Sequence, residues 1–341
     1  MKYLYIIQAL LILCFSAATV SAETAQQQMM NIAAAADENG VIQGKDGWLF
    51  LKEELEHLGS KALYGNAVLE SSKAAKPEFA DPLPAIVDFN QQLKERGIKL
   101  IFAPIPPKAL INSDKLQVAV SPETLSALDK MYADLYAELT AQGVQVLDLI
   151  PLFRSAKDKE QLYCKTDTHY SGAGLSLAAD EFSKEIQKSD WYAGVSKKAY
   201  TKVKQEISIH GDLSAMEKSE SKENLSLDFV TDSATGKAEI SDPDSPVLLL
   251  GDSHTLVFSV GGDLHSSGAG LFDALSADIK FPVDLLGVRG SGATPSRIKL
   301  YQRSRKDKLF LEKKKIVIWC LSARELTGRG GWRKIPIAKK Q

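Results

Sequence analysis

The chain has 341 residues, of which 44% are hydrophobic and 25% are charged, and its formal net charge is −1. This composition is close to that of soluble globular proteins, so the chain can bury a sizeable core. The balanced charge, together with the lack of a basic stripe or an RNA-binding motif in the sequence, excludes nucleic acid as an expected partner.

The first 22 residues have the pattern of a secretory signal. Lys2 supplies a positive start, residues 3–15 are apolar, and residues 20–22 (VSA) have the small-x-small form of a cleavage site. An uncleaved membrane anchor is the alternative, because the apolar stretch is nearly long enough to span a bilayer. The cleavage site favours removal, so we expect an exported protein that begins at Glu23.

The rest of the chain predicts one α/β domain over residues 42–341, preceded by a Gln- and Ala-rich linker or short helix over 23–41. Continuous apolar runs, rather than alternating ones, are typical of strands that are covered on both faces, as in parallel sheets. Five such runs occur, at residues 98–104, 144–149, 246–251, 283–288 and 315–320.

Helical patterns lie between these runs, at residues 82–97, 121–143, 171–188 and 294–310. In the second pattern, Ser121 has the position of an N-cap and Pro122 that of the first helical residue. Strands that alternate with helices predict a three-layer α/β/α fold with a central, mostly parallel sheet of about five strands. Residues 195–245 are rich in Lys, Ser, Asp and Glu, and we expect them to form an insertion or a surface subdomain.

The first chemical signal is VLLLGDSHTL, residues 247–256, in which Ser253 follows a predicted strand. In an open parallel sheet, ligands bind outside the carboxyl ends of the strands. Gly251 permits a sharp turn, and the start of a helix supplies N–H groups that favour a developing oxyanion. Alone, the motif fits a strand end with a helix-capping serine equally well.

The second signal is CKTDTHYSGAG, residues 164–174, which can supply the base that a serine nucleophile needs. Asp167 stands two residues before His169 and can fix the tautomer of its imidazole, which leaves the other ring nitrogen to face Ser253. Ser171 can cap the following helix, so we expect this loop on the same rim of the sheet. The hypothesis is a triad of Ser253 as nucleophile, His169 as base and Asp167 as the residue that orients it.

The other histidines give weaker signals. His57 lies in a charged helical pattern and is expected to face solvent, and His254 is expected to point away from the nucleophile. His210 and His265 lie in the polar insertion and in a Gly/Ser-rich loop. No spacing typical of a metal site connects them, so we predict no metal.

Several motifs occur in an order that resembles the motif order of the alginate O-acetyltransferase family. The members of this family are periplasmic proteins with an SGNH hydrolase-like fold. The motifs lie within residues 41–330 and read GKDGWLF, IKLIFAPIPPKALI, YCKTDTHYSGAG, VLLLGDSHT, GVRGSGATPSRIKLY and KKIVIWCLSAREL. Asp-x-His precedes Gly-Asp-Ser, so the motif order looks circularly permuted relative to ordinary SGNH hydrolases. The resemblance implies the SGNH hydrolase-like fold, a periplasmic location and the triad Ser253, His169 and Asp167.

The glycine and asparagine blocks that form the oxyanion hole of ordinary SGNH hydrolases are not evident in this sequence. Arg289, Gly290 and Gly292 follow a predicted strand, and we interpret them as oxyanion or substrate contacts; the alternative is a glycine turn with an ion-paired arginine. Arg324, just past the last strand, has the same two interpretations. Tyr170 could stack on a sugar ring or could simply pack in the core.

Removal of the signal leaves two cysteines, Cys164 and Cys320. In an oxidising compartment such a pair can form a disulfide, and the alternative is two buried thiols. Cys164 precedes the Asp-x-His loop and Cys320 ends the last strand, so both are expected near the carboxyl edge of the sheet. That placement favours the disulfide.

The resemblance implies an O-acetyltransferase that forms an acetyl-serine and passes the acetyl group to an exported polysaccharide. It also implies a membrane-bound O-acyltransferase as the acetyl donor system and no soluble cofactor. Two alternatives remain, a carbohydrate acetylesterase with the same triad and a non-catalytic scaffold of a polysaccharide export complex. The sequence identifies neither the polymer nor the acceptor, because transfer and hydrolysis differ in how the site excludes water.

Overall fold

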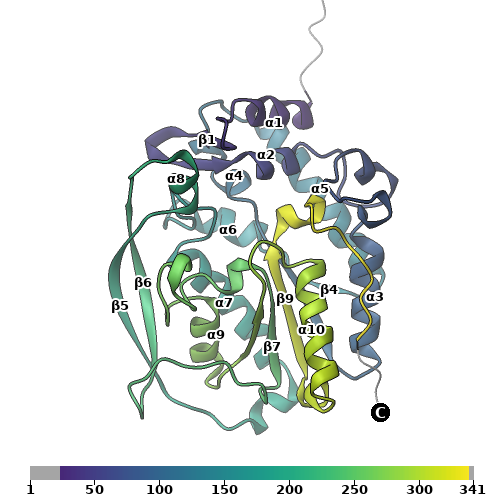
Figure 1. The fold of residues 1–341 in the computed structure, drawn as a ribbon, viewed down its shortest axis with the longest axis vertical. Coiled ribbons are helices and arrows are strands. Elements are labelled where there is room, and N and C mark those ends of the chain that lie inside the picture. Colours follow the sequence, from purple (N-terminus) through teal and green to yellow (C-terminus); the bar gives the residue numbers. More distant parts are fainter. Residues whose placement is uncertain (1–23, 338–341) are drawn as a thin grey trace, which may run out of the picture.

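The computed structural model describes residues 24–337, and its core is a sheet of five parallel strands (Figure 1). The strand order is β4-β3-β9-β7-β8. The strands are β3 (Lys99–Ile105), β4 (Gln145–Val146), β7 (Val247–Gly251), β8 (Asp284–Gly287) and β9 (Ile316–Ser322). This confirms the predicted mostly parallel sheet, whose helices cover both faces.

Strand β9 lies in the middle of the sheet, and all seven of its residues are buried. It pairs with β3 on one side and with β7 on the other, so that Cys320 is in register with both Ala103 and Gly251. Because the strands are parallel, their carboxyl ends meet at one edge, where ligands bind in open α/β sheets. The chain segments after β3, β7 and β9 therefore converge at that edge.

Amphipathic helices bury their apolar stripes on the sheet. Trp319 of β9 packs edge-on against Phe89, with ring centroids 5.1 Å apart, and lies 5.0 Å from the guanidinium of Arg297. Helices α3 and α10, which carry these partners, thus cover the same face. The ten α-helices of the described part are α1 (Ala25–Ala34), α2 (Lys52–Leu58), α3 (Leu83–Lys94), α4 (Lys108–Ile111), α5 (Pro122–Ala141), α6 (Ile150–Ala156), α7 (Gly172–Gln187), α8 (Asp212–Glu217), α9 (Leu271–Ile279) and α10 (Thr294–Lys306).

The predicted helix caps are confirmed. The Ser121 side chain accepts a hydrogen bond from the N–H of Thr124 at the start of α5, and that of Ser171 accepts one from the N–H of Gly174 at the start of α7. Strand β4 is shorter than the predicted run over 144–149, because the chain turns into α6 just beyond it, where Asp148 accepts the N–H of Ile150.

The polar segment 195–245 forms an antiparallel hairpin of β5 (Tyr200–Ile209) and β6 (Glu223–Asp232), with ten paired residues on each strand. In Figure 1 this long hairpin stands at the side of the sheet, and α8 lies at the end where its two strands are connected. Helix α8 therefore reaches the edge at which the parallel strands end. A second, short hairpin joins β1 (Val41–Gln43) and β2 (Leu49–Leu51).

Of the two alternatives for residues 23–41, a linker or a short helix, the structure shows the short helix in the part that it describes. Helix α1 occupies Ala25–Ala34 and packs against α2 and α5, because Met29, Ile32 and Ala33 are buried on one of its faces. The predicted signal over 1–22 lies outside the described residues. Within residues 24–337, no helix combines the length and the apolar character needed to cross a bilayer.

The predicted disulfide is not present in the described part of the chain, where Cys164 and Cys320 are both free, buried thiols. The thiol of Cys164 donates to the carbonyl oxygen of Tyr170 at 3.4 Å, whereas Cys320 is paired between two strands in the middle of the sheet. Burial raises the pKa of both thiols well above the ordinary value. Both side chains therefore behave as small apolar core groups.

A chain that begins at Glu23 should therefore contain two free thiols. A thiol reagent added to the denatured, unreduced protein should count two, and the same reagent should react slowly with the folded protein because neither thiol is exposed or ionised. The variant Cys164→Ser should give a count of one. A count of zero in the denatured protein would show that the two cysteines are bridged.

Candidate active site

The structure brings the three predicted triad residues together in one hydrogen-bonded chain. Nε2 of His169 lies 2.7 Å from Oγ of Ser253, and Nδ1 of His169 lies 2.7 Å from Oδ1 of Asp167. A carboxylate only accepts hydrogen bonds, so Nδ1 carries the proton and Nε2 is free to accept the serine hydroxyl. This is the arrangement in which a serine becomes a nucleophile.

Ser253 is presented by a tight turn at the end of β7. A Cβ on Gly251 would lie 1.7 Å from the carbonyl oxygen of Cys320, so only glycine allows this approach of β7 to β9. The carboxylate of Asp252 then accepts the N–H of His254 at 2.8 Å and the N–H of Ser322 at 2.7 Å. These bonds tie the turn to the end of β9, and Ser253 stays partly exposed while its neighbours are buried.

The loop that carries Asp167 and His169 is held by a buried lysine. Nζ of Lys108 donates to the carbonyl oxygens of Lys165 and Asp167, each at 2.9 Å, and its side chain is only 2% exposed. The cation also lies over the rings of Trp48 and Phe50, at 5.3 and 5.4 Å. Sequence reasoning missed Lys108, although it lies within the quoted motif IPPKALI.

The polar hairpin holds the same loop from the other side. One carboxylate oxygen of Glu223 accepts the N–H of Lys165 and the other accepts the N–H of Thr166, each at 2.8 Å. Asp212 of α8 accepts the N–H of Thr168 at 2.7 Å. The segment expected to be a surface insertion therefore supports the candidate active site.

Asp167 uses both of its carboxylate oxygens. Oδ1 accepts from His169, while Oδ2 accepts the backbone N–H of Asp212 at 2.8 Å and lies 3.0 Å from Nε2 of His265. Burial by itself raises the pKa of Asp167, but the charge of His169 and the hydrogen bonds from His169 and His265 outweigh burial and hold this pKa well below its ordinary value. Asp167 is therefore ionised at neutral pH.

His169 shows the opposite balance. Burial lowers its pKa, but the charge of Asp167 and the hydrogen bond to it outweigh burial and place the pKa above 6.5. A protonated His169 is thus stabilised by the carboxylate of Asp167.

A second histidine–aspartate pair lies beside the triad. Nδ1 of His254 lies 3.2 Å from Oδ1 of Asp252, and its ring centroid lies 4.8 Å from that of His169. Burial lowers the pKa of His254, so its ring is neutral at neutral pH. His254 thus faces its own aspartate, as expected of a residue that is not the base.

Of the two interpretations of Tyr170, the structure shows packing in the core, because Tyr170 is fully buried and donates its hydroxyl to the carbonyl oxygen of His254. The expectation for His57 is wrong. His57 does not face solvent: its two ring nitrogens lie 2.8 Å from the Thr327 hydroxyl and 2.6 Å from the Tyr132 hydroxyl. Burial accordingly lowers the pKa of His57 to about 3.

The four residues in glycine turns or after strands that were proposed as oxyanion or substrate contacts differ in exposure. Gly292 is buried and Arg324 is half-buried, whereas Arg289 and Gly290 are exposed. A Cβ on Gly292 would lie 2.8 Å from the backbone nitrogen of Asp252, so Gly292 packs against the nucleophile turn. Arg324 follows β9, and its buried Nη1 has no hydrogen-bond partner among the residues that the structure describes. Arg289 is exposed and pairs with Asp263 at 2.7 Å, and Gly290 next to it has a φ of 82°.

One group of side chains has the composition of a metal site. Ligand atoms of Asp167, His169 and Asp212 lie within 4.8 Å of one another. However, Nδ1 of His169 is already bonded to Asp167, and the Asp212 carboxylate accepts from the N–H and the hydroxyl of Thr168. These bonds account for the donor atoms, so we assign no metal to them.

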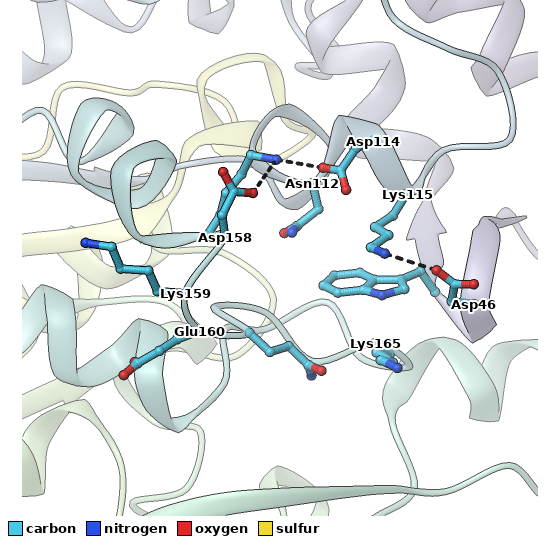
Figure 2. Close-up of a pocket in the computed structure, with 11 residues that line it drawn as sticks. Asp46, Asn112, Asp114, Lys115, Asp158, Lys159, Glu160 and Lys165 are labelled. Atoms are coloured by element: carbon cyan, nitrogen blue, oxygen red, sulfur yellow. Dashed lines mark hydrogen bonds and ion pairs between the residues drawn. The ribbon is translucent and has the colours of Figure 1, made fainter.

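A groove of about 870 Å³ is lined by Asp212 and His265, the two residues that bond Oδ2 of Asp167, although no triad residue lines it directly. Its walls are the end of β5, helix α8 and the loop that contains His265. A second cavity, of about 560 Å³, is lined by Trp48 and by charged residues that include Lys165 (Figure 2). Figure 2 shows Lys115 turned toward Asp46, with which it forms an ion pair. The nitrogen–oxygen distance of this pair is 3.0 Å, and Lys157 pairs with Asp114 at 2.8 Å. None of the triad residues is among the lining residues of this cavity.

The fold is an SGNH-type parallel sheet, and its carboxyl edge carries the hydrogen-bonded residues Ser253, His169 and Asp167. A family model described as "SGNH hydrolase-like domain, acetyltransferase AlgX" matches residues 41–323, and the chain belongs to this family. The resemblance inferred from the motifs is thereby confirmed.

Two solved structures share the fold. The O-acetyltransferase domain of Pseudomonas putida AlgJ has a TM-score of 0.63 at 20% identity, over 84% of this chain and 92% of that one. Pseudomonas aeruginosa AlgX has a TM-score of 0.58 at 17% identity, over 84% of this chain and 62% of that one.

Two curated relatives are named "Probable alginate O-acetylase AlgJ". The one from Pseudomonas aeruginosa is 30% identical over 175 residues, which are 51% of this chain and 40% of the relative. The one from Pseudomonas syringae pv. tomato is 25% identical over 228 residues, which are 63% of this chain and 54% of the relative. The chain thus spans about half the length of the curated relatives it matches.

The electrostatics of the triad predict how the reactivity of Ser253 depends on pH. His169 accepts the serine proton only when it is neutral, and its raised pKa means that it becomes neutral above pH 6.5. The rate at which p-nitrophenyl acetate acetylates Ser253 should therefore rise with pH, with a midpoint above 6.5. Asp167→Asn should lower this rate about 10⁴-fold. A midpoint well below 6.5 would contradict the Asp167–His169 pairing.

Proposed function

We propose that this protein is an O-acetyltransferase that carries an acetyl group on Ser253 and passes it to hydroxyls of an exported polysaccharide. The observation that carries the proposal is the hydrogen-bonded chain from Asp167 through His169 to Ser253. Membership of a family described by an acetyltransferase and relatives named as probable alginate O-acetylases support the same reaction class.

In the first half-reaction, Nε2 of His169 takes the hydroxyl proton while Oγ of Ser253 attacks the carbonyl carbon of an acetyl donor. The new Oγ–carbon bond forms as the bond from that carbon to the donor group breaks, and His169 returns the proton to the leaving group. In the second half-reaction, a sugar hydroxyl gives its proton to His169 and attacks the acetyl carbon. Ser253 leaves and recovers its proton, and the sugar keeps the ester.

The negative charge that develops on the acetyl oxygen needs donors on one side of Ser253. We assign this role to Arg324 and to the backbone near Gly292. The support is the unpartnered Nη1 of Arg324 and the packing of Gly292 against the turn. Arg289 and Gly290, which are more exposed, are assigned to contacts with the substrate.

The acceptor chain would lie in the groove of about 870 Å³ next to Asp167. Its lining mixes polar side chains that can bond sugar hydroxyls with the apolar side chains of Ile207, Ile209 and Met216. The groove lies at the surface, which suits a polymer that extends beyond the enzyme. The donor system would be a membrane-bound O-acyltransferase, and the location would be the periplasm, reached through the signal at residues 1–22.

A carbohydrate acetylesterase is the second candidate function, because Ser253 is partly exposed and water can reach an acetyl group on it. The two reactions share the first half and differ in whether a sugar or water attacks the acetyl-serine. A non-catalytic scaffold has less support, since the complete triad geometry would then serve no purpose.

The nucleophile can be tested by mass spectrometry. Protein incubated with p-nitrophenyl acetate should gain one acetyl group on Ser253, and added oligosaccharide should discharge it as acetylated sugar. Ser253→Ala should show neither product, a loss of at least about 10³-fold. Release of free acetate alone would favour the esterase. Full activity in Ser253→Ala would overturn the nucleophile.

The acceptor groove can be tested by filling it. Ser208 is exposed on β5 and lines the groove, so Ser208→Trp should lower transfer to an oligosaccharide about tenfold while hydrolysis of p-nitrophenyl acetate stays unchanged. Glu206→Trp, on the same strand but outside the groove lining, is the matched control and should leave both rates unchanged. Equal loss of transfer in both variants would place the acceptor elsewhere.

A further inference from the structure

His265 reaches the triad from a segment that no sequence pattern connects with it. It follows a short helical turn (Gly262–Leu264) between β7 and α9. Its Nε2 lies 3.0 Å from Oδ2 of Asp167, and only 12% of its side chain is exposed. Asp167 therefore binds a histidine through each of its two oxygens.

The backbone at His265 is in a conformation that side-chain-bearing residues rarely adopt. Its φ is 73° and its ψ is −80°, values of a strained γ-turn. Glycine adopts positive φ without this penalty, and the same loop uses glycine at Gly261, Gly262 and Gly268, all with positive φ. A strained non-glycine residue persists where its side chain is needed, and here that side chain ends on Asp167.

We propose that His265 is a positioning residue of the triad, which donates its Nε2–H to Oδ2 of Asp167 so that Oδ1 stays aimed at Nδ1 of His169. The proposal rests on the proposed function in taking Ser253 and His169 as nucleophile and base. It adds a fourth side chain to the triad, supplied by a separate loop.

The need for such a donor follows from the other bonds to Asp167. Oδ1 accepts both the backbone N–H of His169, at 2.9 Å, and its ring nitrogen. Oδ2 has one other donor, the backbone N–H of Asp212, which belongs to the polar hairpin segment. The hydrogen bond from His265 to Oδ2 balances the hydrogen bond from His169 to Oδ1, so the negative charge of the Asp167 carboxylate is shared by both oxygens.

The ring of His265 is itself held in place. Its centroid lies 5.6 Å from that of Phe258, which also has a positive φ, of 62°. The backbone of Phe258 accepts the N–H of Ala269, and its own N–H donates to Leu264, so the loop is closed on itself around the ring. A carboxylate accepts only, so the nitrogen that faces Asp167 carries a proton.

Loss of His265 should change the basicity of His169 in a defined direction. Without the second donor, more negative charge of Asp167 faces His169, so the pKa of His169 rises and the base becomes neutral at a higher pH. The other charged or titratable groups around this pair are Asp212 and Glu223 of the hairpin segment, Lys108 of α4, Cys164 of the same loop, His254 of the nucleophile turn, Asp263 of the His265 loop and Arg324 after β9. None of them changes in the variants below.

The test compares His265→Ala with His265→Gln, because a glutamine amide can place an N–H close to the position of Nε2. In His265→Ala, acetylation of Ser253 by p-nitrophenyl acetate should slow about tenfold, and the midpoint of its rise with pH should move up by about half a unit. The KM for the ester should stay unchanged. His265→Gln should recover most of the rate and the wild-type midpoint. Equal rates and midpoints in wild type and His265→Ala would overturn the proposal, as would a His265→Gln as slow as His265→Ala.

Two further measurements separate this role from folding and from the proposed function. His265→Gly removes the strain together with the side chain, so it should melt at a higher temperature than His265→Ala yet be equally slow; recovery of activity in His265→Gly would show that only the backbone matters. An NMR titration of the His169 ring needs no turnover. If wild-type Ser253 is never acetylated, the proposed function fails, but a higher pKa of His169 in His265→Ala would still support the positioning role and an unchanged pKa would overturn it.

Discussion

The carboxylate of Asp167 is the group on which the rest of this site depends. It is 1% exposed, and a buried charge of this kind is stable only when donors satisfy it. Those donors come from its own loop (His169), the polar hairpin segment (Asp212) and the loop before α9 (His265). Three segments that are far apart in the sequence thus meet at one carboxylate. The charge of this carboxylate in turn holds the pKa of His169 above its ordinary value.

The sheet supplies the other half of the site. Because β3, β9 and β7 are parallel neighbours, the segments that follow them meet at one edge. At this edge, the carboxylate of Asp252 accepts one hydrogen bond from its own turn and one from Ser322 after β9. Burial raises the pKa of Asp252, but the interactions with the His254 ring and the backbone N–H of Ser322 outweigh burial and lower this pKa to about 2. Two buried carboxylates, one beneath the nucleophile and one behind the base, therefore fix the distance between Ser253 and His169.

The sequence predicted what local patterns determine. Apolar runs located the strands, Ser121 and Ser171 marked helix starts, and the motifs indicated Ser253, His169 and Asp167, which the structure brings together. It did not predict Lys108 or His265, because each acts through a partner more than fifty residues away and looks like an ordinary polar residue in its own segment. The same limit explains the errors: the charged neighbours of His57 and the position of Tyr170 beside His169 say little about which side chains the tertiary structure buries.

The hairpin segment connects the two halves of the proposed reaction. An acetyl group on Ser253 can be taken by water unless a sugar hydroxyl is held close to it, and a bound acceptor gains a high effective concentration over a free one. The segment forms a wall of the groove that would hold that sugar, and it also bonds the loop of the base through Glu223 and Asp167 through the backbone of Asp212. An acceptor that orders this wall would therefore also steady the aspartate behind the base. In such a design the sugar helps to complete the site that acetylates it, which favours transfer over hydrolysis without requiring Ser253 to be shut away from water.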